Sequence, residues 1–383
     1  MKHKNGLLSS VAGLTLVLAL PAAAELKYEN NSGGFVVLYG QLNPAIISVD
    51  DGQETETNVR DFDASNSRVG LNLEQPYGEN TFRFRFESAL GLPNSTETDQ
   101  NGNDFSGWTR EDIRHVDFSL EGDWGTFSAG QGSMAADGVA EQDLSLVGLV
   151  LYSFTADSNA SFLFRDNAGI LSGPVVVDTT DNFDGSRRTR IRYDTPSFNG
   201  FSFSAAYGQN VLEEDFDDDR DYYDFAVYYG NTFANGMEVA AGLAYQVRGE
   251  GNSGSGGAES EKREDLVGSA SILLENGLSF TVAAGERDVD DDASTDPSFY
   301  YVKVGYEADW FSFGKTGIGL HYWDGSDFNA DGSDSDVWGI GIVQNIDQYN
   351  MEAYFSYQDY AYDDSSDEFD DLSTVVLGAR WRF

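Results

Sequence analysis

The sequence contains no cysteine, which excludes disulfide scaffolds, thiolate metal sites and cysteine nucleophiles. Basic residues are also few, with 23 Lys and Arg against 65 Asp and Glu, and the net charge of −42 would repel the phosphates of nucleic acid. Proline is scarce as well, with 7 in 383 residues, whereas 42 glycines and 14% aromatic residues are typical of a large β protein. With 26 Phe and 20 Tyr, the chain is not a disordered acidic polymer, which would lack aromatic residues.

Long apolar runs are missing too, except for one at the amino terminus. Two lysines precede the apolar run 7–20, and three alanines follow at 22–24. This order predicts a signal peptide over residues 1–24, whose removal would start the mature chain at Glu25 and, by losing the two lysines, change the net charge from −42 to −44. No other stretch approaches the ~20 apolar residues of a membrane helix, so the mature chain either is soluble outside the cytoplasm or crosses a membrane as β-strands.

Apolar and polar residues alternate along many segments of the chain. Phe82, Phe84 and Phe86 alternate with Arg83 and Arg85. The same period of two covers 68–74, 201–208, 237–248 and 351–358. Such alternation indicates strands with one face in oil and one in water, and their length of about ten residues is what a tilted strand needs to cross a membrane. A soluble sandwich with one wet face, the alternative, would have strands nearer five or six residues.

Short and long connections alternate between these segments. The short ones are expected at 76–78, 122–123, 199–200, 235–236, 276–277, a wider 309–316, and 347–349. The long polar ones are expected at 50–59, 92–108, 132–186, 211–221, 249–263, 288–297, 324–335 and 362–371. Together they predict an all-β fold, a 16-stranded antiparallel transmembrane β-barrel over residues 25–383, with short periplasmic turns and long external loops.

Several short motifs, each of them loose, together form a specific combination. They are Leu38-Tyr39-Gly40-Gln41, Ser67-Arg68-Val69-Gly70, Arg114 through Gly125-Thr126-Phe127 with Gly130-Gln131, Arg192 to Phe198 with Gly200, and the final Phe383 on an alternating strand. In this combination the sequence resembles the Gram-negative general porins. The resemblance implies a homotrimer in the bacterial outer membrane, in contact with lipid and lipopolysaccharide. A terminal aromatic residue such as Phe383 is the signal that barrel-assembly machinery reads in outer-membrane proteins.

The connection 132–186 is far longer than the others. A sixteen-stranded barrel leaves an aqueous lumen, so selectivity requires an obstruction, and a loop of this length is usually functional. Its apolar stretch 144–151 suggests packing against another surface. The resemblance implies that this third loop folds into the lumen as the constriction loop, and the alternative is an external loop.

Opposed charges are expected across this constriction. The side chains expected to form a basic wall are Arg68, Arg85, Arg114, Arg188 and Arg190, and those expected on the acidic loop are Asp137, Glu141 and Asp143. The resemblance carries the basic-wall role onto Arg68 and Arg114 by motif, whereas Arg188 and Arg190 are assigned by strand parity near a family arginine. Fixed charges of this kind set what passes through a pore. The alternative is that the arginines solvate a wet lumen or pair with neighbouring acids.

Acidic residues cluster in the expected external loops, near 213–221, 288–296, 324–336 and 363–371. They indicate cation attraction or divalent ions bridging to lipopolysaccharide, or only solubility in a salty habitat. Asp327, Asn329 and Asp331, followed by Gly332, match the first half of a calcium-binding loop, although Trp338 stands where its bidentate Glu is expected. No other cofactor is expected.

The sequence therefore predicts a passive diffusion channel for small hydrophilic solutes and ions, with weak cation preference, rather than an enzyme. The alternatives are a channel specific for a sugar or organic acid, a structural envelope barrel, and a barrel hydrolase. The hydrolase is disfavoured because the mature chain has only two histidines, of which His115 is expected on the lipid side and His321 in the lumen, without a paired nucleophile.

Overall fold

The computed structural model describes residues 26–102, 107–212, 220–252, 259–290, 295–365 and 367–383. The expected signal peptide, most of the acidic stretch 213–221 and the centre of 288–296 lie outside these residues. In the described part of the chain, no helix is long and apolar enough to span a membrane.

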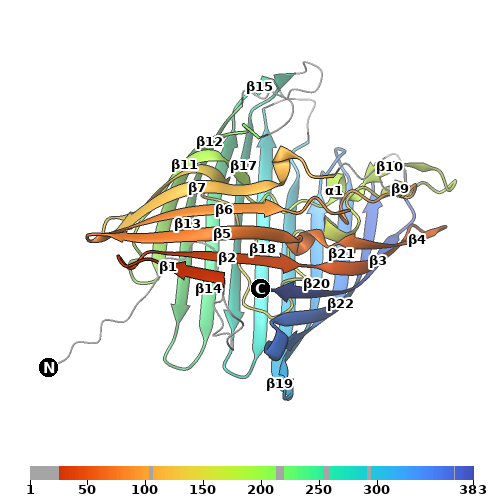
Figure 1. Ribbon diagram of the computed structural model, residues 1–383. Coiled ribbons are helices and arrows are strands. Elements are labelled where there is room, and N and C mark those ends of the chain that lie inside the picture. The colour runs from red at the N-terminus through yellow and green to blue at the C-terminus, as the bar shows by residue number, and fades with distance from the viewer. Residues whose placement is uncertain (1–25, 103–106, 213–219, 253–258, 291–294, 366) are drawn as a thin grey trace.

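The described residues form a closed antiparallel barrel of sixteen wall strands, the first two of which are split into halves (Figure 1). The wall strands are β2 (Phe35–Leu42) with β3 (Pro44–Asp50), β4 (Thr55–Asp61) with β5 (Arg68–Tyr77), β6 (Asn80–Ala89), β7 (Ile113–Gly122), β8 (Gly125–Ser133), β11 (Arg187–Asp194), β12 (Phe201–Gln209), β13 (Asp221–Thr232), β14 (Glu238–Arg248), β17 (Arg263–Leu273), β18 (Leu278–Val289), β19 (Ser298–Phe311), β20 (Gly314–Ser326), β21 (Asp334–Ile346), β22 (Met351–Asp363) and β23 (Leu372–Arg382). The sixteen-stranded prediction is confirmed.

Short elements occupy the connections and the amino terminus. They are β1 (Leu26–Glu29), η1 (Asp63–Ser65), η2 (Arg110–Asp112), η3 (Ala156–Ser158), β9 (Leu163–Arg165), β10 (Leu171–Val175), α1 (Val176–Thr179), β15 (Gly251–Asn252), β16 (Glu259–Ser260) and η4 (Asp347–Tyr349). Strands β9 and β10 pair with each other and lie with α1 at the end of the barrel that carries the long connections, which we call the loop end (Figure 1). These elements therefore belong to connections rather than to the wall.

The barrel closes where the last wall strand meets the first. Strand β23 pairs with β3 through Leu377 and Ile46, and with β2 through Arg382 and Gln41. Phe383 exchanges two backbone hydrogen bonds with Gly40, of 2.9 and 3.0 Å. Beyond this point β1 pairs along β2 in place of β23, so the amino-terminal strand continues the ladder that the carboxyl terminus leaves (Figure 1).

Side chains alternate between the two faces of the wall as the sequence predicts. On β19, Val302 and Val304 are 45% and 46% exposed, whereas Tyr301 and Lys303 are 1% and 2% exposed. The exposed face is apolar and suits lipid, whereas the buried face points into the barrel. A hydrophobic core lies on this inner side at the loop end, where Phe183 stacks on Phe328 and meets Phe299 edge-on.

All seven predicted short turns separate wall strands. Glycine has positive φ in the three Asn-Gly turns, at Gly200, Gly236 and Gly277, a conformation that suits residues without a Cβ. Two predicted lengths were wrong. The wide connection 309–316 is a two-residue turn between β19 and β20, and the first loop, expected at 50–59, is only 51–54, because paired backbone extends the strands further than their apolar residues do.

An arginine at Val304 is expected to destabilise the barrel by about 2–4 kcal/mol, because its charge would sit on the lipid face near mid-strand. The matched variant Ala308→Arg, four residues nearer the turn, should cost about 0–1 kcal/mol because its side chain reaches the interface. Urea unfolding in phospholipid vesicles measures both. Equal costs would contradict the assignment of this face to lipid.

Candidate functional site

The long connection between β8 and β11, residues 134–186, contacts the buried face of distant wall strands. The backbone N–H of Gln142 donates to Ser269 Oγ (2.8 Å) of β17, and the Tyr228 hydroxyl of β13 donates to the Ala135 carbonyl (2.8 Å). On the far side, the Tyr360 hydroxyl of β22 donates to the Thr155 carbonyl (2.7 Å). These wall residues are buried, so segment 134–186 packs against the face that is turned away from the exposed apolar side chains.

Wall glycines make room for the apolar stretch 144–151 of this segment. A Cβ added at Gly317 or Gly319 of β20 would lie 2.7 Å from Leu146 Cβ or from Val147 Cγ2, respectively. At Gly341 of β21 an added Cβ would lie 2.9 Å from a Val150 methyl carbon. These distances are too short for carbon atoms, so the apolar stretch occupies space that side chains would otherwise fill.

A buried ion pair holds the same stretch on the wall. Lys303 of β19 is 2% exposed, and its ammonium donates to Asp143 Oδ2 (2.6 Å) and to the Leu151 carbonyl (2.7 Å). Thr281 Oγ1 donates to the other oxygen of Asp143 (3.0 Å). The structure therefore places Asp143, which the sequence assigns to the acidic side of a constriction, in an anchor between segment 134–186 and β19.

On the strands near the amino terminus, three of the five predicted arginines converge on one carboxylate. Glu87 of β6 is 2% exposed and lies 3.6 Å from Arg68, 2.9 Å from Arg85 and 2.7 Å from Arg114. The Tyr39 hydroxyl also donates to Glu87 (2.8 Å). We call these three arginines with Glu87 the Glu87 cluster. Because three cations share one anion, the cluster carries an excess of two positive charges.

The other two predicted arginines lie apart from the Glu87 cluster. Arg190 is 6% exposed, pairs with Asp117 (2.7 Å) and donates to the Gly130 carbonyl (3.1 Å), so hydrogen bonds fix its guanidinium. Arg188 lies over the Tyr222 ring, 4.3 Å from its centroid. The five arginines thus occupy different sites on the inner wall.

The two remaining acidic candidates lie at the start of segment 134–186. Asp137 lies 3.8 Å from Arg187, a partner that the sequence pattern did not suggest. Glu141 is exposed and accepts from Asn182 Nδ2 (3.3 Å). Although its side chain is accessible to solvent, Glu141 lies on segment 134–186 at the buried face of the wall, where the surrounding protein partly desolvates the carboxyl. This desolvation and the nearby Asp137 carboxylate raise the pKa of the Glu141 carboxyl. Of the three acidic candidates, Glu141 is the one whose charge the described residues leave without an ion pair.

Sequence reasoning missed Glu87, although the signal was present. Glu87 shares its strand parity with Arg85, and register sets it opposite Gly70, beside Arg68 and Tyr39. His115, by contrast, was expected on the lipid side, and this was wrong. His115 follows the inward parity of Asp117, which lies 3.9 Å away, and it is buried. The register shift between Glu87 and Ser88 falls at Arg114, so an inward Arg114 does not place His115 on the outside.

The histidines form no recognisable catalytic arrangement in the described residues. His321 Nδ1 lies 3.3 Å from the Tyr301 hydroxyl, and neither histidine hydrogen-bonds a serine there. The calcium candidates also have other partners, since Asp327 accepts from the Gly332 amide (2.8 Å) and Asn329 donates to the Tyr362 hydroxyl (3.4 Å). The described residues contain no group of three or more acidic residues or histidines arranged to hold a metal ion, and calcium binding stays a prediction.

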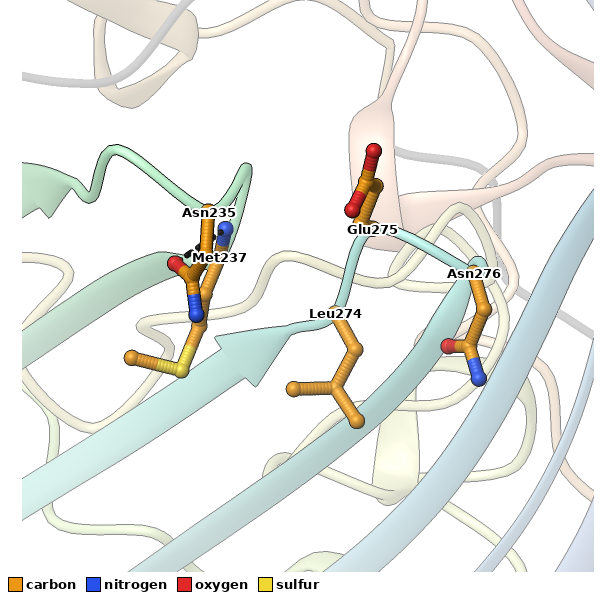
Figure 2. Close-up of a pocket in the computed structure, with 5 residues that line it drawn as sticks. All are labelled: Asn235, Met237, Leu274, Glu275 and Asn276. Atoms are coloured by element: carbon orange, nitrogen blue, oxygen red, sulfur yellow. Dashed lines mark hydrogen bonds between the residues drawn. The ribbon is translucent and has the colours of Figure 1, made fainter.

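An open hollow of about 570 Å³ lies between two short turns, away from these charges (Figure 2). Asn235 and Met237 line one side of it and Leu274, Glu275 and Asn276 the other. Its lining combines one carboxylate and two amides with two apolar side chains on exposed turns, and the hollow is open, so we do not assign a second candidate site there.

Comparisons with known proteins agree with the barrel. A family model for Gram-negative porins matches residues 9–365. Among curated proteins, none matches this sequence. Among solved structures, the chain is similar to an anion-selective porin from Comamonas acidovorans (19% identity, TM-score 0.62, 91% of this chain and 100% of that one). It is also similar to OmpT, an outer membrane protein of Vibrio cholerae (16%, 0.59, 94% and 100%), and to Salmonella typhi OmpF (15%, 0.56, 92% and 99%). At these identities the structural likeness shows the fold alone.

Replacing Asp143 by Asn should loosen segment 134–186, because it leaves the Lys303 ammonium buried without a counter-ion, at a cost of about 3–5 kcal/mol. Limited proteolysis of the detergent-solubilised protein should then cut within 134–186 faster than in wild type. Asp178→Asn, at an exposed site of the same segment, is the control and should leave the cleavage rate unchanged. Equal rates in both variants would show that the ion pair does not hold the segment.

Proposed function

The chain belongs to the Gram-negative porin family, whose members are outer-membrane diffusion channels, and we propose that segment 134–186 is the constriction of its pore. The protein lies in the outer membrane, and small hydrophilic solutes and ions diffuse passively through it. The observation that carries the proposal is the set of contacts between this segment and the buried face of β13, β17, β19 and β22. A segment held on that face narrows the aqueous lumen that sixteen strands enclose.

The charges of the constriction would act on solutes through a transverse field. The Glu87 cluster supplies two excess positive charges on one side, and Glu141, supported by Asp137, supplies negative charge on segment 134–186. Fixed charges in a narrow gap orient water and polar solutes and disfavour apolar ones. The large excess of acids in the whole chain favours cations at the mouths, whereas the Glu87 cluster favours anions inside. We expect a weak net preference for cations.

The remaining parts of the proposal follow from family membership. We propose a homotrimer, in keeping with the trimer form described for Vibrio cholerae OmpT. We propose that the channel makes and breaks no covalent bond, since neither histidine contacts a serine among the described residues. Phe383 ends the closing strand and is the expected contact for barrel-assembly machinery, and the acidic loops are expected to meet lipopolysaccharide.

The channel function is tested by single-channel recording in a planar bilayer. A general pore should give conductance steps of roughly nanosiemens, with current linear in voltage and in salt concentration. Current that saturates with one sugar or organic acid would favour a solute-specific channel. The absence of steps from correctly folded protein would contradict the channel function.

Glu87→Gln should shift ion selectivity towards anions, because three arginines would then face the lumen without their shared carboxylate. The reversal potential in a salt gradient measures this shift. Glu74→Gln is the matched control, because Glu74 pairs with Arg83 near the short turns and its loss removes the same charge outside the proposed constriction. The two variants should differ, and equal reversal potentials would contradict the assignment of the Glu87 cluster to the constriction.

Selectivity should also depend on pH through Glu141. Its pKa is raised, so the carboxylate is charged above that pKa and becomes neutral as the pH falls through it. Lowering the pH from about 8 to about 5 should therefore reduce cation preference before ordinary carboxyl groups titrate. Reversal potentials of Glu141→Gln should change less over this range than those of wild type. An identical pH profile would exclude Glu141 from the ion path.

A further inference from the structure

A second group of arginines lies on the inner wall at its loop end. We call it the loop-end cluster, and it comprises Arg188 of β11, Arg248 of β14, Arg263 of β17 and Arg287 of β18. Strand β14 ends at Arg248 and β17 begins at Arg263, and the register sets these two residues directly opposite each other. Outward neighbours such as Leu243 (54% exposed) and Leu266 (42%) have the other parity, so the arginines point inward.

Positive charge exceeds negative charge in the loop-end cluster. Arg287 is paired with Asp265 (2.8 Å) and Asp181 (3.0 Å), and Arg263 lies 3.3 Å from Asp265. Arg188 lies over an aromatic ring and has no ion pair with a described residue. The Arg248 guanidinium forms neither an ion pair nor a hydrogen bond with a residue that the structure describes. Four guanidinium groups therefore share two carboxylates.

One further carboxylate borders the cluster. Asp224 Oδ2 of β13 accepts a hydrogen bond from the Ala136 amide (2.8 Å) on segment 134–186, whereas its Oδ1 is buried and has no partner among the described residues. It lines a cavity of about 30 Å³, enough for a single water molecule, together with Arg188, Arg248 and Arg263. The cluster thus borders a small polar space on the inner wall.

Four of the 17 arginines in the sequence lie in this cluster, and bringing them together costs free energy of folding. Like charges directly opposite each other on neighbouring strands destabilise a sheet. The Nε–H groups of Arg188, Arg248 and Arg263 are buried and donate to no group in the described part of the chain. An unsatisfied buried donor costs free energy, and a water in the small cavity can accept from these groups. The repulsion between the guanidinium charges remains, and an anion bound at their Nη atoms would offset it.

We propose that the loop-end cluster binds small oxyanions, phosphate or a dicarboxylate, as they enter the pore from the loop side. Guanidinium groups bind such oxygens in a bidentate manner, and Arg248 is the principal ligand because no carboxylate among the described residues pairs with its guanidinium. The inward direction of the four side chains assigns the site to permeating solutes rather than to lipid. The proposal rests on the channel function and adds a class of solute that the pore concentrates at its entrance.

The test is the block of single-channel current in a potassium chloride background of constant ionic strength. Inorganic phosphate and succinate, added in separate experiments on the loop side, should reduce the wild-type current saturably, with a measurable half-blocking concentration. Arg248→Gln should raise that concentration about tenfold, the effect of losing one charge-assisted hydrogen bond. The substitution leaves no carboxylate without its ion-pair partner, because Arg248 has no ion pair among the described residues.

Arg83→Gln is the matched control. It removes the same charge from the inner wall, near the short turns, where Arg83 pairs with Glu74. Its half-blocking concentrations should stay within about twofold of wild type. A block by phosphate alone or by succinate alone would identify which oxyanion the cluster prefers.

Each failure has a distinct signature. Wild-type protein that conducts in potassium chloride but shows no saturable block by either anion would overturn this inference and leave the channel function intact. Equal effects of Arg248→Gln and Arg83→Gln would overturn it too, since net charge would then explain the block. Folded wild-type protein without any conductance would instead contradict the channel function itself.

Discussion

Closure of the sheet between β23 and the split strand β2–β3 pairs the backbone N–H and C=O groups that lipid would leave without partners. Each later feature depends on this ladder. Strand geometry places alternate side chains on opposite faces, and closure turns one of these faces inward. This creates an inner surface that needs polar residues or packing partners. Segment 134–186 supplies those partners over part of the wall, and the charged residues occupy the remainder.

The way charge is distributed on the inner wall differs from the way it is distributed in the whole chain. The sequence has nearly three acidic residues for each basic one, yet Arg68, Arg85 and Arg114 share a single carboxylate. Arg190, by contrast, is neutralised by Asp117, whereas the four arginines of the loop-end cluster share two carboxylates. Net charge therefore describes the mouths of this molecule better than its interior, and only the pairing pattern reveals where positive potential persists.

The sequence was sufficient to predict the strands and turns, because a two-faced environment leaves a period of two and Asn-Gly pairs mark tight connections. It was insufficient where the alternation breaks, as at the register shift beside Arg114, because there both Arg114 and His115 face inward. It also could not give the partners of the charged residues. Glu87 shares a face with Arg85 in the sequence, but it meets Arg68 and Arg114 only through cross-strand register, and Asp143 meets Lys303 across 160 positions. These longer-range pairings leave no local pattern. The roles assigned to these residues in the pore remain predictions.

The glycines beneath segment 134–186 have a consequence for how this protein can diverge. An inward position in a water-filled barrel would ordinarily tolerate many polar side chains. Gly317, Gly319 and Gly341 tolerate none without displacing Leu146, Val147 or Val150, so this patch of wall and the segment can change only together. Substitutions in the lumen are therefore tolerated on the part of the wall that segment 134–186 does not cover. There, a single substitution changes the charge or the width of the pore without displacing the segment.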